Sequence, residues 1–147
     1  MALIPALVLL ALPAAAAARP ATMPTEAQQQ EAVARVAALG LPLYEAGRQG
    51  KYVALTFDDG PGPYTPKVLK ELRKYGFRAT FFVNGKNFGR WSDTLRRTSR
   101  EASVGDHTWS HPYLPKLPTS RQISEVSRSA RASSAITDRR VQLFRPP

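Results

Sequence analysis

Two short polar strings bring together residue types that could hold a metal ion. TFDDGP at residues 56–61 places two adjacent carboxylates after an apolar run, and HTWSHP at residues 107–112 holds the chain's only two histidines, four residues apart. Two imidazoles and two carboxylates suit one ion with three protein ligands, an open coordination position and a spare base. This combination is typical of a hydrolytic metal site.

Each string alone has an ordinary structural explanation. His107 and His111 could be loop histidines bonded to backbone carbonyls, and they share one face only if the segment makes a helical turn. Asp-Gly-Pro is also common turn chemistry. The presence of both strings in one chain favours the metal interpretation. Because consecutive strand-end side chains point in different directions, one aspartate can bind the ion while the other stays nearby as a base.

The elements that must position these residues alternate between strand and helix. Strands are expected at residues 52–57, 79–83, 102–105 and 141–144, and helices at residues 65–75, 91–100 and 119–137. The first strand, a run of β-branched and aromatic residues, is predicted to be buried. This alternation predicts an α/β fold with a mainly parallel sheet covered by helices.

Local signals suggest how two of the helices begin and which faces they bury. Thr65 is expected to cap the first helix, with Pro66 in its first turn, and a capping box is expected at residues 119–122. The predicted inner faces are Val68, Leu69, Leu72 and Tyr75 in the first helix, and Ile123, Val126, Ala130 and Ile136 in the last.

The candidate polar residues recur where predicted strands end. Asp58 and Asp59 follow the first strand, His107 and His111 follow the third, and Arg145 follows the fourth. Carboxyl ends of parallel strands lie at one edge of a sheet, so these side chains are expected to converge there.

Composition is compatible with about one domain and excludes thiolate chemistry. The chain has 147 residues, no cysteine and a net charge of +10. Such a charge could attract an anionic polymer or nucleic acid, but no nucleic-acid motif accompanies it and no nucleic-acid partner is expected. Solvated helix faces explain it more simply, because the arginines are spread along the last helix and its end: Arg121, Arg128, Arg131, Arg139 and Arg140.

The N-terminal region is expected to lie outside the main domain. Residues 1–18 carry no charged side chain and end in alanines, as a secretory signal peptide does, although no Lys or Arg precedes the apolar stretch. Pro5 and Pro13 disfavour a long membrane helix, so secretion or a cell-envelope location is expected. An uncleaved membrane anchor is the alternative. Residues 19–50 are predicted to be a lead-in linker with a weak helix at 27–39, and the domain begins at residue 51.

Taken in order, TFDDGP, HTWSHP and the terminal FRPP resemble the polysaccharide deacetylase (NodB homology) family, carbohydrate esterase family 4. The string ATFFV at residues 79–83 matches too, so the resemblance covers about residues 51–147. It implies a distorted (β/α) barrel, a divalent metal that is most often zinc, and removal of acetyl groups from a polysaccharide such as peptidoglycan or chitin.

The resemblance also implies a role for each candidate. Asp58 matches the family's catalytic base, and Asp59, His107 and His111 match its metal ligands. Arg145 matches the arginine that pairs with the base and holds it in place. The implied reaction is hydrolysis of the acetyl group by a metal-activated water with Asp58 as the base.

Other family residues have no counterpart here. The family protonates the leaving amine with a later histidine, whereas both histidines of this chain match metal ligands and the sequence stops at Pro147. The chain is therefore expected to be C-terminally truncated, to contain about the first half of the barrel and to be impaired as an enzyme. A non-catalytic carbohydrate- or metal-binding remnant is the alternative. No stable protein partner is inferred.

Overall fold

The computed structural model describes residues 53–147 and four earlier positions, Ala27, Glu31, Arg35 and Ala38. These four residues are helical and exposed, and they lie within the helix predicted at 27–39. The predicted signal peptide and the rest of the lead-in lie outside the described residues. In the described part of the chain, no helix is both long and apolar enough to cross a membrane.

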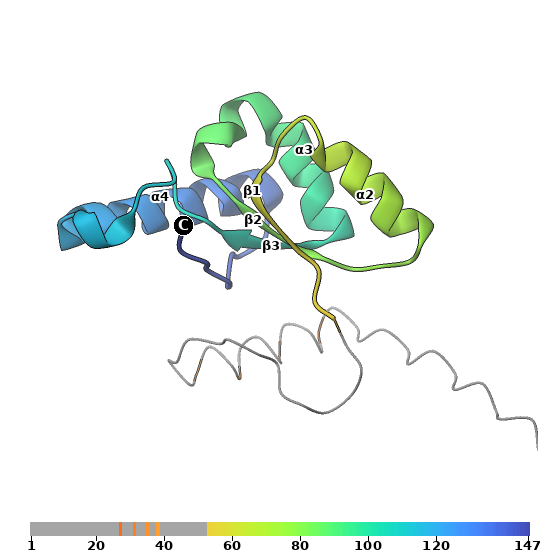
Figure 1. Ribbon diagram of the computed structural model, residues 1–147, viewed down its shortest axis with the longest axis horizontal. Coiled ribbons are helices and arrows are strands. Elements are labelled where there is room, and N and C mark those ends of the chain that lie inside the picture. Colours follow the sequence, from red (N-terminus) through yellow and green to blue (C-terminus); the bar gives the residue numbers. More distant parts are fainter. Residues whose placement is uncertain (1–26, 28–30, 32–34, 36–37, 39–52) are drawn as a thin grey trace, which may run out of the picture.

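Three parallel strands form the centre of the fold, in the order β1–β2–β3 (Figure 1). The strands are β1 (Thr56–Gly60), β2 (Thr80–Val83) and β3 (Ser103–Asp106). The helices are α2 (Thr65–Lys74), α3 (Phe88–Glu101) and α4 (Thr119–Thr137), with short 3-10 turns η1 (Gly85–Asn87) and η2 (Leu114–Lys116). The predicted α/β class with a parallel sheet is confirmed.

The hydrophobic core lies between the sheet and the neighbouring helices α2 and α3, which run side by side over one face of the sheet (Figure 1). Its buried side chains come from all these elements: Leu69, Leu72, Ala79, Phe81, Val83, Phe88 and Leu95. Full burial of a large apolar side chain contributes about 1.5–3 kcal/mol. Phe57 of β1 and Val104 of β3 are partly buried and pack against this cluster, so the core also anchors the two strands whose ends carry the candidate site.

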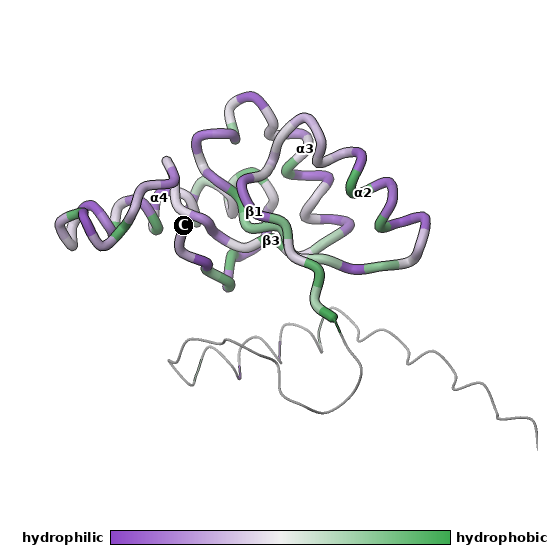
Figure 2. The backbone as a smooth tube through the Cα atoms, in the orientation of Figure 1, coloured by the Kyte–Doolittle hydropathy of each residue, from purple (hydrophilic) through white to green (hydrophobic). Residues whose placement is uncertain are grey.

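The first strand differs from the prediction in position and burial. It begins at Thr56 rather than residue 52, and Val53 before it is 86% exposed. Figure 2 shows the hydrophobic segment before β1 leading away from the sheet. The prediction of a buried strand was wrong because β1 is an edge strand within the described residues, and its outer side has no neighbour there.

The fourth predicted strand is reduced to a single bridge. Phe144 pairs in parallel with Asp106 at the end of β3. The Asp106 N–H donates to the Leu143 carbonyl at 2.8 Å, and the Arg145 N–H donates to the Asp106 carbonyl at 3.0 Å. Residues 143–145 therefore lie where a fourth strand was expected, but their pairing is too short to form one.

The predicted helix caps do not form. The N-cap of α2 is Tyr64, and the Thr65 hydroxyl accepts from the Gly62 N–H at 3.0 Å instead. The N-cap of α4 is Pro118. Gln122 of the expected capping box donates from Nε2 to the Leu117 carbonyl at 2.8 Å. Thr65 and Thr119 are the first residues of α2 and α4, so each lies one position too late to cap its helix.

The fully buried residues of α4 are small and polar, although Ile136, which was predicted to face inward, is partly buried and packs against the core. Ile123, predicted to face inward, is 62% exposed, whereas Ser129 and Ser133 are buried. Small side chains let α4 pack closely against α3 and η1. In α2, Leu69 and Leu72 are buried and Val68 packs against the core as predicted, whereas the prediction for Tyr75, which follows α2 and is exposed, was wrong. The five arginines assigned to solvated faces are all exposed.

Candidate metal centre

The end of β1 presents the two carboxylates in different directions. Pairing with β2 shifts register between Phe57 and Gly60, so this strand carries a bulge at Asp58 and Asp59. Bulges re-aim side chains and are common near active sites. Asp59 adopts φ 66°, a left-handed conformation that few non-glycine residues adopt. The aspartates thus lie within the end of the strand rather than after it, and the bulge separates their orientations.

The two histidines lie on a turned loop, not on a helix. Thr108 and His111 both have positive φ, at 69° and 64°. The Thr108 N–H donates to Asp106 Oδ1 at 3.1 Å, and the His111 N–H donates to the Thr108 hydroxyl at 3.2 Å. The helical turn considered for this segment is therefore absent, and these side-chain bonds hold the loop instead. Such conformations tend to cluster at functional sites.

Helix α4 fixes the middle of the same loop. The carboxylate of Glu125 accepts from the Ser110 N–H at 2.7 Å and from its hydroxyl at 3.0 Å. The Arg128 guanidinium lies 3.6 Å from the centre of the Trp109 ring. The loop between the histidines is thereby fastened to an element on which sequence reasoning found no site residue.

Three potential ligand atoms converge at the edge of the sheet. Asp59 Oδ1 lies 3.2 Å from His111 Nε2 and 3.8 Å from His107 Nε2. One ligand atom from each of these residues lies within 4.8 Å of the other two. Two imidazole nitrogens and a carboxylate oxygen are donors that zinc accepts. The convergence predicted from the sequence is present.

The hydrogen bonding of His107 suits ligation. Its ring is almost fully buried, and Nδ1 lies 2.7 Å from the Arg145 carbonyl oxygen. A carbonyl can only accept, so Nδ1 carries a proton, and Nε2, the nitrogen that faces Asp59, is the one left to bind an ion in the neutral ring. Metal-binding histidines commonly donate their other nitrogen to such an acceptor. The residues present therefore fit a zinc-type ion.

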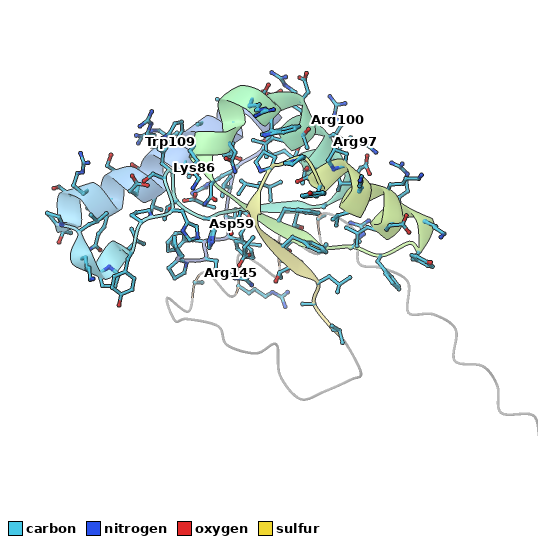
Figure 3. All side chains as sticks on the ribbon, turned by 45° about the horizontal axis from the view of Figure 1, so that its top comes forward. Asp59, Lys86, Arg97, Arg100, Trp109 and Arg145 are labelled. Atoms are coloured by element: carbon cyan, nitrogen blue, oxygen red, sulfur yellow. The ribbon has the colours of Figure 1, made fainter. Side chains whose placement is uncertain are left out.

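The Arg145 side chain contacts Asp58, the aspartate outside the ligand cluster, whereas its backbone carbonyl faces His107. Its Nη1 donates to Asp58 Oδ1 at 2.7 Å and to the Thr56 hydroxyl at 3.0 Å. The guanidinium also lies 4.1 Å from the centre of the Phe82 ring. In Figure 3, Arg145 and Asp59, the neighbour of Asp58, are labelled in the same part of the view, whereas Arg97 and Arg100 on α3 lie away from them. The five predicted site residues are thus brought together in two neighbouring groups.

Asp106, which sequence reasoning missed, is a buried carboxyl beside these ligands. Burial raises its pKa above the ordinary value of 3.8, and the nearby Ser129 hydroxyl and the Thr108 N–H offset only part of that rise. Although Ser129 is close enough to lower the pKa, Asp106 Oδ2 and the Ser129 hydroxyl form no well-aligned hydrogen bond within the described residues. The charged form of Asp106 is therefore unfavourable in the fold.

Replacing Asp106 with asparagine is expected to stabilise the metal-free protein at pH 7 by about 1 kcal/mol. The amide keeps an acceptor for Thr108, brings a donor near Ser129 and removes the buried charge. Because the folded-state pKa is raised, the carboxyl is least destabilising below pH 3.8 and becomes more so as pH rises. The difference between the proteins should therefore shrink towards pH 4.

Urea unfolding of chelator-treated protein between pH 4 and 7 measures this difference. The exposed Asp93 provides the control, since Asp93→Asn should change stability little at either pH. An Asp106→Asn protein less stable than the unaltered chain at pH 7 would contradict the expectation.

Comparison with known proteins gives a consistent result. Residues 45–147 match the family model of polysaccharide deacetylases. The chain is 40% identical over 99 residues to the peptidoglycan-N-acetylmuramic acid deacetylase PdaC of Bacillus subtilis (strain 168), covering 66% of this chain and 21% of PdaC. It is 39% identical over 114 residues to a chitin deacetylase of Colletotrichum lindemuthianum, covering 74% of this chain and 44% of that protein.

A solved structure agrees with the sequence matches. The structure of PdaC from Bacillus subtilis superposes with a TM-score of 0.64 at 40% identity, over 67% of this chain and 50% of that chain. The present chain therefore spans half of the solved PdaC chain and less than half the length of the two curated relatives.

Proposed function

The chain belongs to the polysaccharide deacetylase family, and from this premise we propose that it derives from a metal-dependent hydrolase of N-acetylated polysaccharide. Peptidoglycan and chitin are the substrate types, because its relatives are named as deacetylases of these polymers. The observation that carries the proposal is the convergence of Asp59, His107 and His111 next to the Asp58–Arg145 pair.

The proposed chemistry assigns one group of residues to the ion and the other to the proton. Asp59, His107 and His111 hold a zinc-type ion, which when bound polarises an acetyl carbonyl and lowers the pKa of water. Asp58 takes the proton of the attacking water. Arg145 fixes the Asp58 carboxylate through Oδ1 at 2.7 Å. As the carbon–nitrogen bond breaks to give acetate and an amine, the amine nitrogen must receive a proton.

That last proton transfer is the basis for proposing that these 147 residues alone are impaired. Both histidines lie in the ligand cluster, so Asp58 must return its proton unaided. The same observation keeps the second candidate open, a non-catalytic protein that binds carbohydrate or metal.

Acetate release from an N-acetylated chito-oligosaccharide tests both candidates. Residues 19–147 with zinc are expected to show activity at background. A chimera that adds the part of the PdaC domain not matched by this chain should release acetate, and a chelator should stop it. An inactive chimera that still binds the oligosaccharide would favour the non-catalytic candidate. Robust, chelator-sensitive turnover by residues 19–147 would refute the proposed impairment.

We further propose that the protein is exported, with residues 1–18 as a cleaved signal peptide. Their uncharged, apolar composition and alanine-rich end support this. The mature chain is expected to begin near Arg19, and mass spectrometry of protein recovered from the culture medium or cell envelope would establish its first residue. Recovery of intact Met1 in the membrane fraction would favour an uncleaved anchor.

A further inference from the structure

Residues 84–87, which follow β2, hold the backbone of the strand end that carries Asp59. The Asn87 side-chain amide donates from Nδ2 to the Asp59 carbonyl at 2.9 Å and lies 3.4 Å from the Gly60 carbonyl. The Asn84 N–H donates to the same Gly60 carbonyl at 2.8 Å. These bonds hold the carbonyls of Asp59, whose backbone is left-handed, and of the next residue, Gly60.

The same four residues also hold the histidine loop. Asn84 Nδ2 donates to the His107 carbonyl at 2.7 Å. The Gly85 N–H donates to the Thr108 carbonyl at 3.1 Å, and the Lys86 N–H donates to the Trp109 carbonyl at 2.8 Å. Figure 3 shows Lys86 and Trp109 next to each other beside α4. Residues 84–87 thus bridge the two segments that supply all three candidate ligands.

The sequence of this bridge suits close contact with both segments. Asn84 is fully buried, so its donated bond to His107 is shielded from water. A Cβ atom on Gly85 would clash with the Trp109 ring, so a residue with a side chain does not fit there without a shift. The bridge therefore has little freedom to move relative to the histidine loop.

We propose that Asn84 and Asn87 are positioning residues that set the separation between Asp59 and the two histidines before an ion binds. This inference rests on the metal-binding role proposed above. Neither asparagine is one of the candidate ligands; each acts through backbone carbonyls at or next to those ligands. Ligands held at the right separation lose less freedom on binding, and removing such outer partners typically lowers metal affinity about 10–100-fold.

Zinc titration of the full chain by calorimetry tests the proposal through Asn87, which is only half-buried and therefore tolerates replacement better than Asn84. Asn87→Ala is expected to weaken zinc binding about 10–100-fold. Asn87→Asp, which keeps the size but removes both N–H donors, should do the same. The absorption spectrum of the Co²⁺-loaded protein should change in both variants, because it reports the arrangement of the ligands.

Gln122→Ala is the matched control, because Gln122 also donates a side-chain amide to a backbone carbonyl, at the start of α4. It should lower the urea midpoint of the metal-free protein about as much as Asn87→Ala while leaving zinc affinity unchanged. Normal zinc affinity in both Asn87 variants would overturn the inferred positioning role but leave the proposed metal site standing. Absence of zinc binding by the unaltered chain would refute the metal site as well.

Discussion

Replacing His111 with alanine is expected to abolish stoichiometric zinc binding by this chain. The substitution removes one of three ligand atoms. Losing only a hydrogen-bond partner of a ligand typically lowers metal affinity about 10–100-fold, so the loss here should be larger. His111 is the better probe of the two histidines because its side chain is 38% exposed and that of His107 only 4%, so its loss leaves the core intact. His107→Ala should abolish binding too, with a larger loss of stability.

Calorimetric titration of the metal-free protein with zinc provides the measurement. Tyr113→Ala is a suitable control, since Tyr113 is an exposed residue two positions after His111 and is not among the ligand candidates. Undiminished affinity in His111→Ala would show that the cluster is not the zinc site.

Exchanging each aspartate for asparagine should separate the two carboxylates by function. Asp58→Asn is expected to bind zinc normally and to lose about 10²–10⁴ in turnover, the usual contribution of a general base. Asp59→Asn should lose zinc and turnover together. The reason is geometric: Asp58 bonds to Arg145, whereas Asp59 Oδ1 faces both histidines.

Zinc binding is measured in the full chain, and turnover in the chimera described above. Asp93→Asn is the control, because it makes the same chemical change at an exposed carboxyl on α3. If Asp58→Asn lost the ion while Asp59→Asn retained it, the assigned roles would be reversed.

The sequence was sufficient to predict the order of the elements and the meeting of the candidate residues. A short apolar run predicts β2 and helical spacing of apolar residues predicts the helices, and parallel strands must place their carboxyl ends at one edge. That constraint is why Asp59 and His107, 48 positions apart in the sequence, were expected to meet. In the structure, Asp59 Oδ1 lies 3.8 Å from His107 Nε2.

Features that depend on neighbouring elements could not be predicted in this way. A periodic pattern identifies an apolar stripe but not what covers it, so the exposure of Ile123 on α4 and of Val53 before β1 was missed. The left-handed backbone at Thr108 was equally hidden, because a β-branched residue gives no local signal for that conformation.

Asn84 and Asn87 were missed for a different reason. Asparagine after a strand is an ordinary turn residue, so its type alone suggests no further role. Their position was the available signal, since β2 ends at the same edge of the sheet as β1 and β3. It was the one predicted strand end from which no candidate had been taken.

The contacts of Arg145 also bear on the order in which the molecule folds. They close separations of 87 residues to Asp58, 89 to Thr56 and 38 to His107. The entropic cost of closing a loop rises with its length, and contacts distant in sequence slow folding. The pairing of β1, β2 and β3 closes shorter loops and can precede these contacts. The contacts of Arg145 with Asp58 and His107 are therefore expected to form late. A refolding chain should regain its secondary structure before its candidate site is assembled.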